Sequence, residues 1–506
     1  MPFFESPLAK PQAIEAREYQ INILRTAAGN NTLVVLPTGL GKTAIAIMLA
    51  CQRLEKFPDS KILIVAPTRP LCEQHRKSFA ESLEIPDKEI VLLTGKISPE
   101  ARKEIYQKAK IISATPQTIQ NDLKTGKLNL EKFSLLVVDE VHKAVKGYAY
   151  PFVCKIYREQ AANQRILGLT ASPGSDEARI KEICENLFAT AVEIRSEEDA
   201  DVAQYVKQKN FLQVRVELPQ KMKYTQSSLK LCLRELLEKL KKYKIFAFSK
   251  KDLLLAQIRA RKNLRRNPMN FQIISLVAEA LKVWHALELI ETQSVGAAKK
   301  YFDEMRKKSD KASIRLSQSA PFQNAARNVE ELALSGEEHP KISALKEIIS
   351  KEFSENKNVK IIVFSHYREN ISRLLEVLKN VCAPISLIGQ SGEKGLSQKE
   401  QIDVLKDYEA GIYNCLITSP IGEEGLHIAS ADTAIFYEPV ASEIRTIQRR
   451  GRVGRTKLGK IIFLITKGTR DEANFYTAKR KENKMKEILK SMKQEKENTL
   501  ARFEKI

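Results

Sequence analysis

The sequence is short of the residues that build disulfide frameworks, zinc sites and membrane spans. Its 506 residues include seven cysteines, six histidines and one tryptophan, and no two cysteines form a Cys-x-x-Cys pair. Several, such as Cys51, Cys154 and Cys415, lie inside apolar runs, so we expect buried, reduced thiols and no zinc site. No apolar run approaches the ~18 residues of a membrane-spanning helix, and the first residues carry no secretion signal. We expect a cytoplasmic protein without a membrane partner.

Acidic residues are also scarce relative to basic ones. The chain has 62 aspartates and glutamates against 84 lysines and arginines, which gives a formal net charge of +22 and a pI near 9.5. This basic excess indicates an anionic partner, and nucleic acid fits better than a membrane surface. Binding to DNA would place the protein at the nucleoid. The alternative is a lysine-rich surface that is simply solvated.

A glycine-rich loop, Leu-Pro-Thr-Gly-Leu-Gly-Lys-Thr, occupies residues 36–43. It lies between an apolar run predicted to be a strand and a run of helical period. Such a loop directs backbone N–H groups and the dipole of the helix at one phosphate group. The lysine would reach the β- and γ-phosphates, and the last threonine would bind Mg²⁺. Leu36 replaces the first glycine of the strict pattern, and the alternative is an ordinary glycine turn. The predicted nucleotide-binding residues of the loop are Pro37, Thr38, Gly39, Gly41, Lys42 and Thr43.

Two adjacent carboxylates make the nucleotide interpretation stronger. Residues 134–138, Ser-Leu-Leu-Val-Val, read as a buried parallel strand, and Asp139 and Glu140 follow directly. Ligands of open α/β sheets bind at the carboxyl ends of the strands. Asp139 is predicted to hold Mg²⁺, and Glu140 to orient or deprotonate the attacking water. With the glycine loop, this pair predicts a nucleoside-triphosphate hydrolase.

Short apolar runs alternate with helical patterns in two separate stretches of the chain. The expected strands are residues 32–36, 62–66, 111–114, 135–138 and 166–169, and then 360–364, 385–388, 415–418, 433–437 and 461–465. This alternation is typical of parallel sheets covered by helices. We expect an α/β fold with domains at 1–200 and 341–470, an all-α insert at 201–340, and a charged C-terminal helix at 471–506.

The insert combines apolar helical faces with basic clusters. Leu229, Leu233, Leu236, Leu237 and Leu240 share one face, and Ile273, Val277, Ala280, Trp284 and Leu287 share another. Residues 310–320 are polar and aperiodic, and we expect a loop there. One basic cluster consists of Arg261, Lys262, Arg265 and Arg266, which we predict to contact nucleic acid.

The motifs occur in a specific order along nearly the whole chain. They are Arg17–Gln20, Leu36–Thr43, Ala66–Leu71, Leu93–Gly95, Ala114–Gln117, Asp139–His142, Thr170–Ser172, Ile361–Ser365, Thr418–Leu426 and Gln448–Arg455. This set resembles the superfamily 2 helicases of the DExH type, and most closely their Hef and Fanconi anaemia group M translocase branch. The resemblance implies two RecA-like domains that flank the insert, with ATP and Mg²⁺ as cofactors.

Further roles are carried over from that resemblance. Arg452 and Arg455, which lie on one helical face with Arg449, would be arginine fingers, and Gln448 would help to place the water. The predicted nucleotide contacts are Arg17, Gln20, Gly425 and His427, and His427 stands where the family has an aspartate. The predicted coupling residues are His142, Thr170 and Ser172. The predicted nucleic-acid contacts of the two motor domains are Thr68, Arg69, Gly95, Thr115 and Thr418.

Three functions are consistent with these residues. The first is an ATP-driven helicase or translocase on branched or forked DNA, with a nuclease or a sliding clamp as a candidate partner in trans. The second is an RNA-directed helicase or duplex-RNA sensor of the same superfamily. The third is a nucleic-acid-binding scaffold that only switches with ATP, which the intact Lys42, Asp139 and Glu140 argue against. The sequence contains no Glu-Arg-Lys nuclease motif, so we expect no nuclease activity from it.

Overall fold

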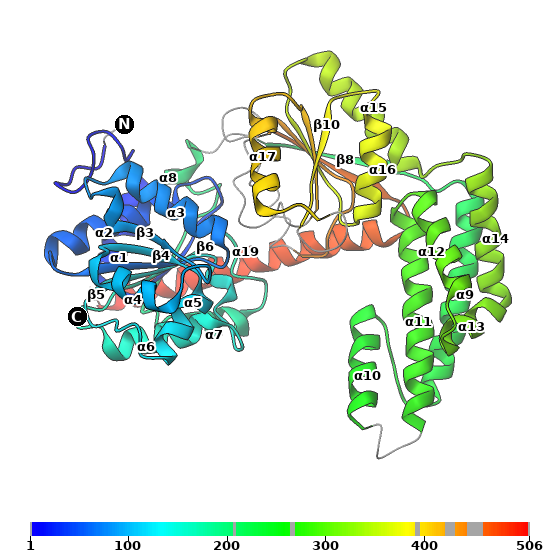
Figure 1. Ribbon diagram of the computed structural model, residues 1–506, viewed down its shortest axis with the longest axis horizontal. Helices are drawn as coiled ribbons and strands as arrows, with labels where there is room; N and C mark the ends of the chain where they lie inside the picture. The colour runs from blue at the N-terminus through cyan, green and yellow to red at the C-terminus, as the bar shows by residue number, and fades with distance from the viewer. Residues whose placement is uncertain are drawn as a thin grey trace.

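A computed structural model describes residues 3–205, 209–263, 269–389, 395–419, 431–442 and 459–503 of the chain. Figure 1 shows two separate sheets with flanking helices, a helical insert to the right, and one long C-terminal helix that runs from the insert to the first sheet. The expected fold class, two parallel α/β domains with an all-α insert between them, is confirmed. No helix in the described ranges combines the length and apolar character needed to cross a membrane.

The first sheet has seven parallel strands in the order β3-β4-β2-β5-β6-β1-β7. They are β1 (Thr32–Val35), β2 (Lys61–Val65), β3 (Ile90–Leu93), β4 (Ile111–Ala114), β5 (Phe133–Val138), β6 (Ile166–Thr170) and β7 (Ala191–Ile194). Side chains alternate between the two faces: Leu33 and Val35 lie in one core cluster and Val34 in the other. Strand β6 therefore separates β1, which leads into the glycine loop, from β5, which leads into Asp139.

Helices cover both faces of this sheet. They are α1 (Glu18–Gly29), α2 (Lys42–Lys56), α3 (Arg69–Ser82), α4 (Pro99–Lys108), α5 (Pro116–Lys124), α6 (Ala149–Gln160), α7 (Glu177–Asn186) and α8 (Ala200–Ala203). Two 3-10 turns, η1 (Asp87–Glu89) and η2 (Val141–Lys143), complete the domain. Helices α1 to α3 pack on one face, and α5 to α7 pack on the other.

The second sheet is also parallel, with the strand order β10-β11-β9-β12-β13-β8. Its strands are β8 (Lys209–Val216), β9 (Ile361–Phe364), β10 (Pro384–Leu387), β11 (Cys415–Thr418), β12 (Thr433–Phe436) and β13 (Gly459–Thr466). Its helices are α15 (Pro340–Glu355), α16 (Arg368–Leu378) and α17 (Gln398–Glu409). Strand β8 falls in the stretch expected to belong to the insert, but it pairs with β13 over its whole length and forms the edge of this sheet.

The insert is a bundle with its own apolar core. Its helices are α9 (Gln220–Lys241), α10 (Lys250–Lys262), α11 (Met269–Thr292), α12 (Val295–Lys307), α13 (Lys311–Gln318) and α14 (Ala320–Leu334). The two predicted apolar faces, on α9 and α11, pack into this core. The prediction of a loop at 310–320 is wrong, because helix α13 occupies most of that stretch. Asp310 caps α13 by accepting a hydrogen bond from the Ser313 N–H, and Leu316 is buried.

A buried ion pair joins the insert, the second sheet and the C-terminal helix. Lys341 of α15 and Asp471 of α19 (Arg470–Phe503) are fully buried and paired, and the Lys341 ammonium also donates to the Tyr437 carbonyl at 2.8 Å. Beside them, the Gln293 side-chain amide at the end of α11 donates to Glu438 at 2.7 Å. Because breaking a buried ion pair is strongly destabilising, the pair holds α15 to α19, and the Gln293–Glu438 hydrogen bond ties the insert beside them.

The same helix α19 continues to the first sheet. Arg470, its first residue, pairs with Glu288 and Glu291 of α11. Further along, Met485 and Leu489 are buried in a core cluster of the first domain (Figure 1). The charged C-terminal helix expected from the sequence is therefore held at its first residue and again near its middle.

The docking of α19 can be tested with one substitution. Leu489→Ala removes a buried side chain, a change worth about 2–5 kcal/mol in a packed core. We expect the C-terminal half of α19 to exchange its amide hydrogens at least about tenfold faster, as measured by hydrogen–deuterium exchange. Lys490→Ala, at the exposed neighbouring position, is the matched control and should leave the exchange unchanged. Equal exchange in the two variants would show that the contact does not hold the helix.

Candidate nucleotide and nucleic-acid sites

The glycine loop lies where the sequence predicts it, between β1 and α2. Gly39 and Gly41 have φ values of +86° and +76°, which glycine adopts without strain. Gly41 is the N-cap of α2, so the first N–H groups of that helix face the loop. The Lys42 ammonium donates to the carbonyls of Leu36 and Pro37 at 2.9 and 3.3 Å, which holds it across the loop. The loop is thus a cationic cradle at a helix N-terminus, an arrangement that suits a phosphate group.

Gln20 is fixed against the same loop. Its side-chain amide donates to the Leu40 carbonyl at 3.2 Å and accepts from the Arg17 N–H at 3.1 Å. A Cβ at Gly41 would collide with the Gln20 amide nitrogen, so a larger residue there would have to displace the Gln20 side chain as well as adopt a positive φ. Tyr19, which lies in the Arg17–Gln20 motif but was given no role there, also donates to the Leu40 carbonyl, at 2.8 Å.

Asp139 is a buried carboxylate with a full set of partners. His75 Nε2 lies 2.8 Å from one carboxylate oxygen, and the Glu140 N–H donates to the other at 2.8 Å. Burial would raise the pKa of Asp139, but the hydrogen bond and charge of His75, the charge of Lys42 and the Glu140 N–H together lower it. The carboxylate is therefore ionised at neutral pH, as a magnesium ligand must be. His75 was missed because no motif contains it.

Glu140 and His142 form the next link. Glu140 takes the left-handed conformation (φ +48°), which is uncommon for a residue other than glycine. The turn brings its carboxylate to 3.2 Å from His142 Nδ1, and the same nitrogen lies 3.4 Å from the Thr170 hydroxyl. Glu140 and Thr170 thus meet at one ring nitrogen of a buried histidine.

Thr170 ends β6, the strand between the glycine loop and Asp139. Its carbonyl accepts from the Leu36 N–H at 3.0 Å, and its hydroxyl accepts from the Ser172 N–H at 3.1 Å. The Ser172 hydroxyl in turn lies 3.0 Å from the sulfur of Met485 in α19. The predicted coupling residues therefore form a continuous path from the glycine loop to the C-terminal helix.

The predicted second half of the nucleotide site lies outside the described residues. Gly425 and His427 fall in 420–430, and Gln448, Arg452 and Arg455 fall in 443–458. These five positions remain predictions from the sequence.

Four of the predicted nucleic-acid contacts share one end of the first sheet. Thr68, Gly95 and Thr115 follow β2, β3 and β4, which are neighbours in the sheet. Thr68 and Thr115 are the N-caps of α3 and α5, and Arg69 is the first residue of α3. Gly95 is exposed, with no other atoms within 4 Å of the position where a Cβ would be. This edge presents helix N-termini and an open backbone, which suit phosphate contacts that ignore base sequence.

Thr418 does not join this surface. It is fully buried, and its hydroxyl donates to the carbonyls of Leu387 and Ser419 at 3.2 and 3.1 Å. A hydroxyl satisfied by backbone carbonyls inside a sheet cannot reach a phosphate, so the predicted direct contact is corrected. In the insert, Arg261 and Lys262 lie exposed in the last turn of α10, whereas Arg265 and Arg266 lie outside the described residues.

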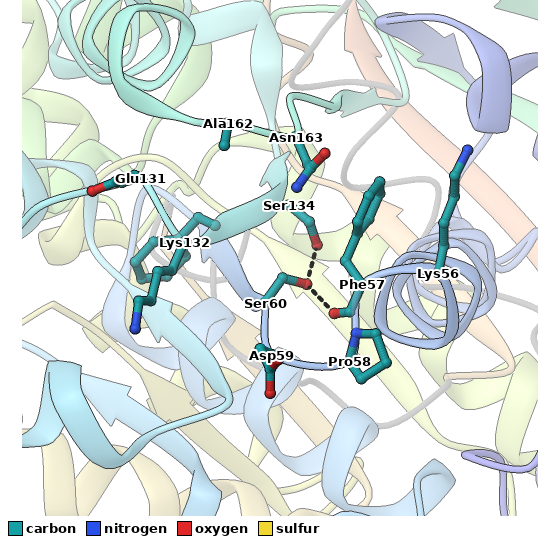
Figure 2. Close-up of a pocket in the computed structure, with 11 residues that line it drawn as sticks. Lys56, Phe57, Pro58, Asp59, Ser60, Glu131, Lys132, Ser134, Ala162 and Asn163 are labelled. Carbon is teal, nitrogen blue, oxygen red and sulfur yellow. Dashed lines mark hydrogen bonds between the residues drawn. The ribbon is translucent and has the colours of Figure 1, made fainter.

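A hollow elsewhere on the first domain is not the nucleotide site. Figure 2 shows it at the amino-terminal ends of β2 and β5, lined by Phe57, Ser60, Ser134 and Asn163 among others. The Ser60 hydroxyl donates to the Phe57 carbonyl at 2.7 Å and lies 2.6 Å from the Ser134 hydroxyl. Ligands of parallel sheets bind at the opposite, carboxyl ends, where Lys42 and Asp139 are.

Three family models match successive parts of the chain. The DEAD/DEAH box helicase model covers residues 17–180, and the helicase conserved C-terminal domain model covers residues 340–457. Between them, residues 221–339 match the family "Putative ATP-dependent RNA helicase, helical bundle". The matched segments correspond to the first sheet, the second sheet and the insert.

Several known proteins are similar over most of this chain. A "Putative ATP-dependent RNA helicase" of Methanocaldococcus jannaschii is 40% identical over 500 residues, which cover 97% of this chain and 63% of that protein. The ATP-dependent DNA helicase MPH1 of Pyricularia oryzae is 31% identical (94% and 45% covered), and the mouse Fanconi anemia group M protein homolog is 30% identical (94% and 26% covered). The chain thus spans less than two thirds of each of these relatives.

One solved structure matches the chain nearly end to end. The crystal structure of the Pyrococcus furiosus Hef helicase domain is 40% identical and superposes with a TM-score of 0.72, covering 91% of this chain and 98% of the other. The order of the motifs, the two sheets and the insert between them agree with that match. The chain belongs to the superfamily 2 ATP-dependent helicases, within the Hef and Fanconi anaemia group M branch.

Proposed function

We propose that this chain is an ATP-driven motor that moves along one strand of branched or forked DNA and separates or remodels the duplex there. The observation that carries the proposal is the path from Lys42 through Asp139, Glu140 and His142 to Thr170 at the carboxyl edge of the first sheet. On this proposal the groups that would bind phosphate, hold the metal and handle water lie beside β6, whose end leads to Ser172 and its contact with α19.

The residues present fit ATP and Mg²⁺. The left-handed glycines and the N-terminus of α2 leave room and N–H groups for the phosphates, and the ionised Asp139 with the Thr43 hydroxyl would hold Mg²⁺. When bound, Mg²⁺ neutralises charge on the phosphates. Gln20, held at the loop by Leu40, would read the adenine edge, with Arg17 beside it.

The chemistry assigned to the chain's own groups is limited to positioning and proton handling. Glu140 would orient the attacking water and accept its proton, and His142 would hold the Glu140 carboxylate in place. Arg452 and Arg455, with Gln448 near the water, would complete the site from the second domain, and Gly425 and His427 would line its nucleotide side. Thr170 and Ser172 would pass the state of the site to α19.

The nucleic acid would cross the edge formed by Thr68, Arg69, Gly95 and Thr115, and the basic insert would hold a second arm of the branch. DNA is favoured by the named activity of the MPH1 relative, whereas the name of the Methanocaldococcus relative favours RNA. A nuclease or a sliding clamp that acts in trans, and a place at the nucleoid, belong to the same proposal.

The decisive experiment compares ATPase stimulation by forked DNA, a Holliday junction, linear duplex DNA and duplex RNA at one salt concentration. We expect the branched DNAs to stimulate most. Stimulation by duplex RNA alone would replace this proposal with the RNA-directed one, and binding without any stimulated turnover would replace it with the scaffold.

Two substitutions separate binding from turnover at the site. Lys42→Ala should abolish ATP hydrolysis while DNA binding persists, because the proposed DNA contacts lie on other loops. Glu140→Gln should keep ATP affinity and lose stimulated turnover, since only the group that handles water is changed. ATP binding by calorimetry and turnover by phosphate release check both. Near-normal turnover in Glu140→Gln would remove Glu140 from the catalytic role.

Gly41→Ala tests the geometry of the loop. The added Cβ meets a φ of +76° and the Gln20 amide together, so we expect ATP affinity to fall by about tenfold or more. Gly29→Ala, at a helical position where a Cβ meets nothing within 4 Å, is the matched control and should bind ATP normally. Unchanged affinity in Gly41→Ala would mean that the loop adapts freely.

The basic cluster of the insert makes a prediction about salt. Arg261→Gln with Lys262→Gln, extended to Arg265 and Arg266, should weaken binding to forks more than binding to single strands. The slope of log affinity against log salt should shrink by about 0.9 for each duplex phosphate that the variant protein no longer neutralises. An equal weakening on both substrates would mark the cluster as a general basic surface.

A further inference from the structure

The segment between α9 and α10 turns its large rings outward. Ile245 and Ala247 pack against the core of the insert, whereas Phe246 and Phe248, at the alternate positions, are 63% and 86% exposed. Burial alone would favour the opposite choice, because phenylalanine has far more apolar surface to hide than alanine. The segment packs Ala247 against the core and exposes Phe246 and Phe248, which indicates that the two rings bind a ligand.

The exposed position of Phe248 is fixed by the start of α10. Phe248 directly precedes the N-cap Ser249, where an apolar residue often packs back on the helix as a hydrophobic staple. Here Asp252 accepts hydrogen bonds from the N–H groups of Phe248 and Ser249, at 3.1 and 2.9 Å, and the ring still faces solvent. Farther back, the Ile245 N–H donates to the Leu240 carbonyl at 3.2 Å. The backbone is pinned on both sides of the two rings, so they are pre-organised.

The surroundings of the rings are strongly cationic. Residues 239–262 contain nine lysines and arginines and one acidic residue, Asp252, whose carboxylate caps α10. Lys241 and Lys250 pair with Glu238 and Glu288, and Lys251, Arg259, Arg261 and Lys262 lie along α10 itself. A partner with flat apolar faces and regular negative charge matches this combination, and an unpaired nucleic-acid strand has both.

The spacing of the rings fits bases. Phe246 and Phe248 are exposed at alternate positions, and in a fully extended chain such positions lie at most about 6.6–6.8 Å apart, twice the ~3.4 Å between stacked bases. Helix α10 lies on the side of α11 that faces the first sheet (Figure 1). The helix that the rings precede is therefore on the motor side of the insert.

We propose that Phe246 and Phe248 form a stacking platform for unpaired bases of the strand displaced at the branch point. The inference rests on the proposed function and adds to it the chemical feature of the fork that the insert reads. The aromatic platform recognises bases that have left the duplex, and the exposed Lys244 and Lys251 next to the rings hold the phosphates of the same strand. Arg261 and Lys262, at the other end of α10, contact the duplex arm.

A double-mutant cycle between protein and DNA tests this directly. Phe246→Ala/Phe248→Ala and the native protein are titrated, without ATP, with a fork whose unpaired arms are about 15 nucleotides long, and with the same fork carrying abasic sites next to the branch. We expect the double variant to bind the intact fork about 5- to 100-fold more weakly, the factor for ~1–3 kcal/mol per stacked base at 1.4 kcal/mol per tenfold. On the abasic fork the two proteins should bind equally.

Salt and control variants separate stacking from charge. Removing a stack releases no counterions, so the salt slope of the Phe246→Ala/Phe248→Ala protein should equal that of the native protein, unlike that of the Arg261→Gln/Lys262→Gln protein. Leu334→Ala, which removes another apolar side chain of the insert that is 81% exposed, should bind both forks normally. Phe248→Tyr should restore most of the affinity, since the tyrosine ring also stacks.

Two outcomes would overturn the inference. Equal binding of the intact fork by the native and double-variant proteins would assign the rings to a protein partner instead. An equal weakening on intact and abasic forks would assign their effect to the fold. The cycle measures binding without ATP, so its result does not depend on ATP hydrolysis. If forks failed to stimulate the ATPase, the proposed function would be wrong, and the binding cycle would still test the aromatic platform.

Discussion

The buried pair between Lys341 and Asp471 decides how the three parts of the protein stand relative to one another. Its partners come from the start of α15, the end of β12 and the start of α19, and the end of α11 is bound alongside. His339 lies in the same layer, and its burial and the charge of Lys341 lower its pKa to about 3. The ring is therefore neutral, and its Nε2 lies 3.1 Å from the Glu291 carbonyl. Removing one partner would leave an uncompensated charge in the interior, so the insert cannot shift without rebuilding the junction.

This junction lies next to the stretch predicted to carry the arginine fingers. Glu438 accepts hydrogen bonds from Gln293 of the insert and from Ser365 and the His366 N–H of the second sheet. Burial raises the pKa of the Glu438 carboxyl, against the opposing charge of Lys341. A movement of the insert would therefore be transmitted through these hydrogen bonds to Glu438, which precedes residues 443–458 in the chain. The buried polar groups around Glu438 would thus link nucleic-acid binding by the insert to closure of the nucleotide site.

The parts of the fold that were predictable have strong local signals. Central strands such as β1 and β5 are fully buried and mostly aliphatic, and the glycine loop has a fixed spacing. Strand β8 could not be placed in the same way, because it is an edge strand whose partner, β13, lies far along the chain. No feature of the sequence near β8 identifies that partner. Helix α13 is only eight residues long, too short to show a clear period.

The site divides along the same line. Lys42 and Asp139 could be assigned from their motifs, and Thr170 from the family resemblance, whereas their supporting partners could not. His75 reaches Asp139 from the buried face of α3, and Met485 reaches Ser172 from the far end of the chain. A histidine that shares a helical face with Cys72 and Phe79 was the available signal for the first. Thr418 shows the opposite error. It lies in a motif and was predicted to contact nucleic acid, but its hydroxyl donates to the Leu387 carbonyl inside the sheet.

Helix α19 gives the motor a lever of known length. The stretch of this helix from Asp471, in the buried ion pair, to Met485, beside Ser172 on the first domain, is about 21 Å long. A tilt of about 5° at the first end would carry Met485 through about 2 Å. A rearrangement of a few hydrogen bonds in the junction would thus reach the first sheet as a shift of Met485 against Ser172.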